Sequence, residues 1–184
     1  QTIVSYVEDI NHQINKVYPS VFYITEKDGI LIIVKNGTIN LKQVIFIFIE
    51  KSDTYKILYS LLNNGKFTYS DLEYTLMLST ASIYRKISDI NGFLKEFDIS
   101  VQNGRMVGSE LQIRYFYFQL LTQLIPFETL IKNAENKQIL KIVEDIEIEL
   151  DITLSLENRA KFYTWINIVT LRYRNINHII FDER

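Results

Sequence analysis

The most constraining feature of the sequence is a helical apolar pattern that runs into a tight-turn signal. The apolar residues of this pattern are spaced 4, 3 and 4 apart: Ile83, Ile87, Ile90 and Leu94. This spacing predicts a helix with one buried face, and Ser79 is well placed to cap its start. Asn103-Gly104 then lies between the short apolar segments 99–101 and 105–107, which predicts a two-residue hairpin.

Two shorter helical segments precede this pattern. Residues 54–62 repeat apolar side chains at helical spacing with Asp53 as the expected cap, and residues 70–77 follow with Ser70 as the expected cap. The order helix, helix, short turn, helix, hairpin is that of a winged helix-turn-helix domain. We therefore predict such a domain over residues 52–108.

The polar side of the third helix is the candidate recognition surface. Arg can read the edge of guanine with two hydrogen bonds, and hydroxyl groups and Lys can hold phosphates. Six residues on this side are predicted to meet the major groove: Ser79, Thr80, Ser82, Tyr84, Arg85 and Lys86. Lys66 and the wing residue Arg105 are predicted to contact flanking phosphates. A solvated helix face or a protein-docking module would show the same pattern, so these alternatives stay open.

The beginning of the chain repeats this organisation. Residues 3–14 align with residues 83–94, with Asp9-Ile10-Asn11 matching Asp89-Ile90-Asn91 and the apolar spacing kept. Residues 1–51 are therefore predicted to be the C-terminal part of a first winged helix-turn-helix, with a recognition helix, a wing and a linker helix.

The first wing is expected to be longer than the second. Apolar segments flank Lys27-Asp28-Gly29, which predicts a hairpin there, and Asn36-Gly37 predicts another hairpin turn. The two helices that should open this first module are missing and the chain begins without Met. We therefore expect the chain to be a fragment of a longer protein.

Residues 109–184 are predicted to contain three helices. We expect helices over about 109–125, 127–151 and 156–174. One stripe is expected to be apolar: Ile139, Ile142, Val143, Ile146 and Leu150. The opposite face, which we interpret as solvated, has mostly acidic residues: Lys141, Glu144, Asp145, Glu147 and Glu149. A second stripe is interpreted as core or as a surface for a partner helix: Phe162, Trp165, Ile166, Val169 and Tyr173.

Composition argues against an enzyme. The chain has no Cys and only two His, and it lacks a glycine-rich phosphate loop and paired His spacing. We therefore expect no catalytic residues, no metal site and no cofactor.

The most apolar stretch, residues 44–49, is too short to span a bilayer, so we expect a cytoplasmic protein with no membrane partner. A net charge of −2 gives DNA binding no bulk electrostatic support.

Two stretches resemble a known family. They are LMLSTASIYRKISDINGFLKEFDISV and GSELQIRYFYFQL, which begin at Leu76 and Gly108. They resemble the Mga-type transcriptional regulators of Gram-positive pathogens, the group that includes the M-protein trans-acting positive regulator and the anthrax toxin activator. This resemblance implies two consecutive helix-turn-helix modules followed by helical domains similar to phosphotransferase-system (PTS) regulation domains. The expected fold is thus mainly α with small β-hairpin wings, and residues 109–184 would be the N-terminal part of one regulation domain.

The resemblance also implies partners and a regulatory chemistry. The partners would be double-stranded DNA, RNA polymerase, PTS phosphotransfer proteins and a second copy bound through a missing C-terminal part. Regulation domains of this kind are phosphorylated on His, but Trp165 stands where one such His is expected. His178 is the remaining candidate for phosphorylation, and a structural or exposed His is the alternative.

Three functional hypotheses follow from these observations. The first is a virulence-type transcription activator whose second winged helix reads the major groove while the helical part sets its activity. The alternative from another class is a protein-interaction or oligomerisation module for which the winged helices are a scaffold. The third is a phosphate-regulated sensor that binds DNA only weakly on its own.

Overall fold

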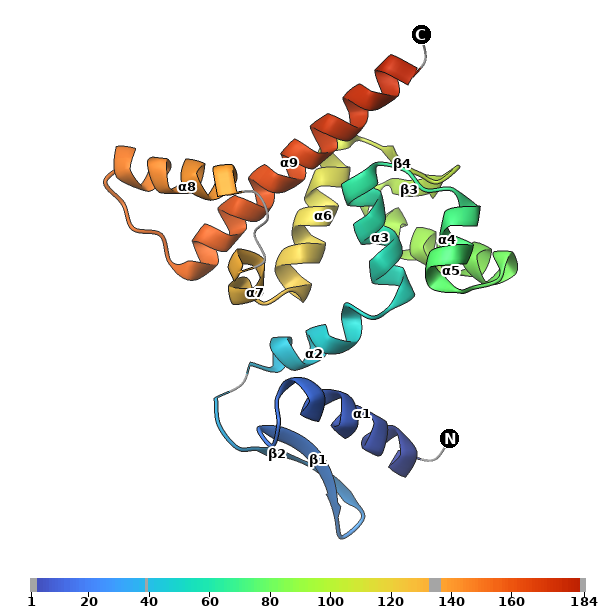
Figure 1. Cartoon of the computed structure of the whole chain (residues 1–184), viewed down its shortest axis with the longest axis vertical. Coiled ribbons are helices and arrows are strands. Elements are labelled where there is room, and N and C mark those ends of the chain that lie inside the picture. The colour runs from blue at the N-terminus through green and yellow to red at the C-terminus, as the bar shows by residue number, and fades with distance from the viewer. Residues whose placement is uncertain (1–2, 39, 133–136, 183–184) are drawn as a thin grey trace. The chain divides into compact units, whose positions relative to one another are not determined.

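The computed structural model describes residues 3–38, 40–132 and 137–182, and the side chains among them up to residue 175. These residues form two compact units, residues 1–50 and 51–184. Each unit contains a helix followed by a two-stranded antiparallel hairpin (Figure 1). The expected class, mainly α with small β hairpins, is confirmed.

The first unit is a helix, a hairpin and a second helix. Its elements are α1 (Ile3–Val17), β1 (Phe22–Lys27), β2 (Ile30–Lys35) and α2 (Leu41–Ile49). The hairpin turns at Asp28 and Gly29, which both have positive φ as this tight turn requires. Ile14, Phe22 and Val44 form its buried cluster.

The predicted hairpin turn at Asn36-Gly37 is wrong. The strand pairing ends at Phe22 and Lys35, so Asn36 follows the hairpin instead of joining two strands. The backbone N–H of Asn36 donates to the Val21 carbonyl at 2.7 Å and its side chain donates to the Ser20 carbonyl at 3.3 Å. These bonds close the open end of the hairpin, and the turn signal there marks the exit of the chain from the strand.

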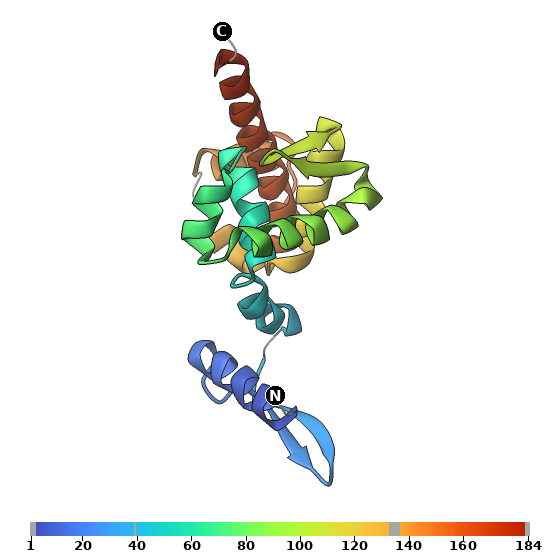
Figure 2. The same cartoon turned by 90° about the vertical axis from the view of Figure 1, so that its right-hand side faces the viewer.

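The second unit begins with the predicted helix-turn-helix and wing. Its first elements are α3 (Asp53–Asn64), α4 (Tyr69–Leu76), α5 (Thr80–Leu94), a 3-10 turn (Lys95–Phe97), β3 (Ile99–Gln102) and β4 (Arg105–Gly108). All four apolar residues of the α5 pattern are buried, and the hairpin turns at Asn103-Gly104, so both predictions are confirmed. In the turned view the hairpin follows the C-terminal end of α5 (Figure 2).

Two of the three predicted helix caps are one or two residues out of place. Ser79 caps α5 as predicted, but Ser52 caps α3 and Thr68 caps α4. Asp53 is instead the first residue of α3, where a carboxylate still interacts favourably with the helix dipole. Thr68 was missed although it forms a reciprocal capping box with Asp71, a pattern that is visible in sequence.

The same asparagine clamp joins helix and hairpin in both units. In the second unit the Asn91 side chain donates to the Val101 carbonyl at 3.0 Å and accepts from its N–H at 2.6 Å. In the first unit Asn11 makes the same pair of bonds with Ile24, at 2.6 and 2.7 Å. The repeated Asp-Ile-Asn motif thus sets the same helix-to-strand geometry twice.

Four helices complete the second unit. They are α6 (Glu110–Leu124), α7 (Phe127–Lys132), α8 (Lys137–Glu149) and α9 (Leu156–Asp182). The helix predicted over 127–151 is therefore two helices. The long α9 packs against α6, α7, α8 and also α3, the first helix of the helix-turn-helix (Figure 1). Across the described residues, no helix combines the length and apolarity that a membrane crossing requires.

The aromatic stripe predicted on α9 is not its buried face, so of its two interpretations the surface for a partner helix stays open. Phe162 and Tyr173 are 45% and 63% exposed, so the predicted stripe is not core. The buried residues of α9 instead include Tyr163, Ile168 and Arg172. Aromatic residues occupy both faces of this helix, and therefore spacing alone could not select the buried one.

The face of α8 that was interpreted as solvated contains one buried acid. Glu147 accepts from the Leu154 N–H at 2.8 Å and from the Arg159 guanidinium at 2.7 Å. The Leu154 bond, together with Arg159, lowers the pKa of Glu147 despite its desolvation. Glu147 therefore holds the loop between α8 and α9, whereas Ile142 and Leu150 of the expected apolar stripe are exposed.

A buried ion pair and a tyrosine join the late helices to each other and to α3. Arg172 of α9, which is only 5% exposed, forms two hydrogen bonds with Glu110 of α6, at 2.8 and 3.1 Å. Burial raises the pKa of the Glu110 carboxyl, but the adjacent Arg172 and Arg114 together bring it below 4.5. The buried Tyr117 hydroxyl, whose pKa burial raises, stays protonated and donates to the Leu58 carbonyl at 3.0 Å.

We predict that Asn91→Ala lowers the free energy of unfolding by about 1–3 kcal/mol, because it leaves both polar groups of Val101 without their partner. Urea unfolding measures this change. Asn63→Ala, at an exposed position of α3, is the matched control and should cost less than about 0.5 kcal/mol. Equal effects of the two substitutions would show that the clamp contributes nothing.

A second prediction concerns acid pH and Glu110. Because its pKa is lower in the folded state, the stability that Glu110 contributes is present above its ordinary pKa of 4.5 and disappears as pH falls through the folded-state pKa. Urea unfolding should therefore show Glu110→Gln to be less stable than the parent at neutral pH, with a difference that shrinks below about pH 4. A difference that stays constant down to the acid limit would contradict the ion-pair account.

Candidate nucleic-acid interface

The start of α5 is organised by two serines. Met77, at positive φ, ends α4 and turns the chain into Ser79. The Ser79 side chain accepts from the Ser82 N–H at 3.3 Å, and the two hydroxyls lie 3.0 Å apart. Ser82 is therefore half-buried in the cap, while Ser79 is exposed at the N-terminal end of the helix, where N–H groups favour an anion.

Thr80 and Tyr84 tie α5 to α4. The Thr80 hydroxyl donates a short hydrogen bond to the Glu73 carboxylate. The Tyr84 ring stacks on Tyr69 with the ring centres 4.7 Å apart and an angle of 26° between the rings. Tyr84 is still 55% exposed, so one part of its side chain supports the helix-turn-helix and another part faces outward.

The two basic residues of α5 differ in their surroundings. The Lys86 ammonium lies 3.0 Å from the Asp53 carboxylate at the start of α3, and both side chains are partly buried. Arg85 is exposed, and its guanidinium has no hydrogen-bond or ion-pair partner among the residues that the structure describes. Arg85 is thus available to a ligand, whereas Lys86 also helps to fix α5 against α3.

The two predicted wing residues are neighbours. Lys66 and Arg105 form a β-bridge, so the segment after α3 extends the wing beyond its two strands. The Phe67 N–H donates to the Gly104 carbonyl at 3.0 Å, and a side chain at Gly104 would collide with the Phe67 carbonyl at 2.1 Å. The sequence predicted both cations, but the strand pairing that brings them together was not visible in it.

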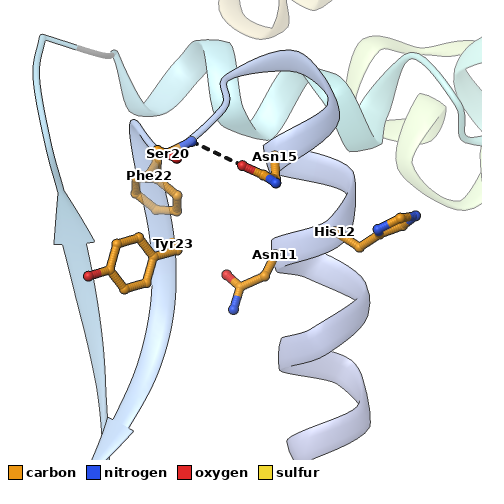
Figure 3. Close-up of a pocket in the computed structure, with 6 residues that line it drawn as sticks. All are labelled: Asn11, His12, Asn15, Ser20, Phe22 and Tyr23. Atoms are coloured by element: carbon orange, nitrogen blue, oxygen red, sulfur yellow. Dashed lines mark hydrogen bonds between the residues drawn. The ribbon is translucent and has the colours of Figure 1, made fainter.

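Two other features involve residues outside α5 and the wing. His178 belongs to α9, but its side chain falls outside the described part of the chain. In the first unit, a pocket of about 330 Å³ lies between α1 and β1 (Figure 3). Asn11 and Asn15 point toward the strand and His12 points away, with Asn15 accepting from the Ser20 N–H at 3.0 Å. The side-chain oxygen and nitrogen of Asn11 are both hydrogen-bonded to Ile24, so Asn11 lines this pocket as part of the clamp.

The described residues form no candidate metal site. Within residues 3–38, 40–132 and 137–182, no three His, Asp or Glu side chains are grouped so that they could hold a metal ion. The arrangement that the structure does present is an exposed helix N-terminus, a free arginine and a basic wing.

Comparison with known proteins agrees with this arrangement. The family model of the Mga helix-turn-helix domain matches residues 37–121. The similarity to an Mga helix-turn-helix domain thus covers one segment of the chain. It begins just before α2 and runs into α6, and it contains the whole of α4, α5 and the wing. The Mga resemblance expected from the motifs around Ser79 and Gly108 is thereby confirmed.

One curated relative extends the similarity beyond the Mga domain. It is a putative trans-acting regulator of Streptococcus pneumoniae serotype 4, 23% identical over 182 residues. The alignment covers 96% of this chain and 36% of the relative, so the chain spans about a third of the length of the curated relative it matches.

The sequence did not reveal the residues that hold α5 in place. Asp53, Tyr69 and Glu73 hold Lys86, Tyr84 and Thr80 in place, yet none was singled out for that role. These contacts join separate helices, and helical spacing within one segment gives no signal for them.

Proposed function

We propose that this chain is a DNA-binding part of a transcriptional regulator in which α5 enters the major groove. The observation that supports this most directly is the outward face of α5 within an Mga helix-turn-helix domain: Arg85 is exposed and has no described partner. An arginine in this state can offer a guanine two hydrogen bonds without first breaking an internal ion pair.

The other candidate residues are proposed to contact DNA phosphates or to position α5. Ser79 and Thr80 lie at the N-terminal end of α5, where hydroxyls and backbone N–H groups can meet one phosphate. Lys86 has three donors, so the ammonium can meet a phosphate while it also faces Asp53. Lys66 and Arg105 approach the backbone from the wing. Tyr84 and Ser82 complete the recognition surface.

We propose three functional parts along the chain. Residues 1–51 act as the C-terminal part of a first winged helix-turn-helix, residues 52–108 as the second, and residues 109–184 as the N-terminal part of a PTS-regulation-like domain. The asparagine clamp that recurs at Asn11 and Asn91 supports the first two assignments. Because α1 has no Lys or Arg before Lys16, α5 is the stronger DNA reader.

The wider role that we propose is that of an activator of virulence type in the cytoplasm. RNA polymerase, a second copy of the protein and PTS phosphotransfer proteins would be its further partners. Phosphorylation of His178 is proposed from the family resemblance, because Trp165 occupies the position where a phosphorylated His is expected. A phosphoryl group there would add close to two negative charges to α9.

A protein-interaction or oligomerisation module is the second candidate function. The exposed aromatic residues Phe162, Trp165 and Tyr173 on α9 favour it, together with the net charge of −2. In this case the winged helices would be a scaffold. The two functions differ in what a substitution in α5 does, because only the first requires Arg85.

We predict that Arg85→Ala lowers affinity for a selected duplex by about 1–3 kcal/mol and removes sequence preference. The duplex is first selected from a random pool with the parent protein, and affinity is then measured by gel shift. Arg85→Lys keeps the charge but loses the planar fork, so it should retain affinity for random duplexes and lose preference. Circular dichroism should be unchanged in both variants.

Lys141→Ala, at an exposed position of α8, is the control that removes a positive charge elsewhere. It should leave the preference intact. If Arg85→Ala binds the selected duplex as tightly as the parent does, the interaction module becomes the better account.

A further inference from the structure

The C-terminal end of α3 is held by a side chain from α9. The Asn175 side chain donates to the Leu62 carbonyl at 2.8 Å. Leu62 lies in the last turn of α3, where carbonyl groups have no partner within the helix. Asn175 therefore supplies a bond that α3 cannot make for itself.

Close packing reinforces this contact. Gly65 ends α3 in the left-handed conformation, with φ of 73°. A side chain added there would come within 2.7 Å of the Asn175 Cβ, so the backbone of α3 and the surface of α9 are directly apposed. Gly65 is thus required both for the turn and for the approach of α9.

The segment that Asn175 holds leads straight into the wing. Lys66 follows Gly65 and bridges to Arg105, and the next residue, Phe67, bonds to Gly104 at the tip of the hairpin. Only a few residues of continuous backbone separate the Asn175 contact from the two wing cations. Lys66 and Phe67 thus connect the end of α3 directly to the wing.

The part of α9 that contains Asn175 is also bonded to α6. It lies three residues after Arg172, so the two side chains share one face of α9. Arg172 bonds to Glu110 of α6, and Tyr117 of α6 bonds to α3 one turn before Leu62. Helices α6 and α9 are thus bonded to each other and both are bonded to α3. Figures 1 and 2 both show α9 running beside α3.

We propose that Asn175 is a positioning residue for the wing: by holding the end of α3, it sets where Lys66 and Arg105 meet DNA. This rests on the proposed function and adds a route of regulation to it. Any event that shifts α9 along α3 changes the phosphate contacts of the wing while α5 keeps its contacts with α4. The helical part of the chain then adjusts affinity without altering sequence preference.

Hydrogen exchange on the full chain tests the positioning without DNA. In Asn175→Ala, the amides of Lys66, Phe67 and the 103–106 turn should exchange at least about tenfold faster, because their local opening becomes easier. The amides of α5 should keep the parent rates. Asn167→Ala, on the same helix and with no described hydrogen bond, is the matched control and should change neither group.

The result that overturns the proposal is equal exchange at the wing in the two variants. Uniformly faster exchange over all of residues 51–184 also overturns it, since Asn175 would then serve general stability. Asn175→Asp, which keeps the size but removes the donor, should reproduce the local effect. If it behaves like the parent, the hydrogen bond to Leu62 has no role.

DNA binding provides the second readout. Loss of wing contacts should lower the slope of log affinity against log salt by about 1–2 in Asn175→Ala, with the preference for the selected duplex unchanged. A loss of preference would place Asn175 in the support of α5 and contradict the proposal. If the parent protein binds no duplex, the proposed function fails, whereas the exchange experiment still decides the role of Asn175.

Discussion

Burial of one side of α5 is the constraint on which the rest of the candidate interface depends. Ile83, Ile87, Ile90 and Leu94 are each 6% exposed or less. Each such side chain contributes about 1.5–3 kcal/mol relative to exposure to water. Because exposing these residues to water would cost this free energy, the opposite side of α5 must face outward. The position of Arg85 on that outward side therefore follows from packing.

The supporting contacts make this orientation specific. Apolar burial alone allows small rotations of α5, but the Lys86–Asp53 ion pair, the Tyr84–Tyr69 stack and the Thr80–Glu73 hydrogen bond each fix it against a neighbouring helix. An ion pair that is only partly buried contributes little stability in general. Here the ion pair matters because it fixes the orientation of α5. It also occupies Lys86, so Arg85 is the basic residue of α5 without a described partner.

The sequence predicted those features of the fold that depend on residues close together in the chain. The apolar spacing of α5, the cap at Ser79 and the Asn103-Gly104 turn all depend on neighbouring residues, and each was predictable. The buried face of α9 was not, because it is decided by long-range partners such as Glu110, which lies 62 residues before Arg172. Glu147 was misjudged because its partners, Leu154 and Arg159, lie outside α8 and the spacing within that helix does not indicate them.

In the candidate site, too, the sequence indicated the residues but not their long-range contacts. All six candidate residues could be selected from the sequence, but the structure was needed to show that Arg85 has no described partner while the other five make contacts within the domain. The repeated asparagine was visible as a motif, yet its role as a clamp became clear only when both copies were seen to bond to a strand. The link from Asn175 to Leu62 spans 113 residues and no local pattern indicates it.

The most direct test of the central claim is to locate α5 on DNA. The chain has no Cys, so Ala81→Cys creates a single attachment point on the exposed first turn of α5 for a reagent that cleaves DNA. The account predicts cleavage concentrated within the selected duplex site, and none from the same reagent at Lys141→Cys on α8. Cleavage that is absent from the α5 position, or equal from both positions, would contradict it.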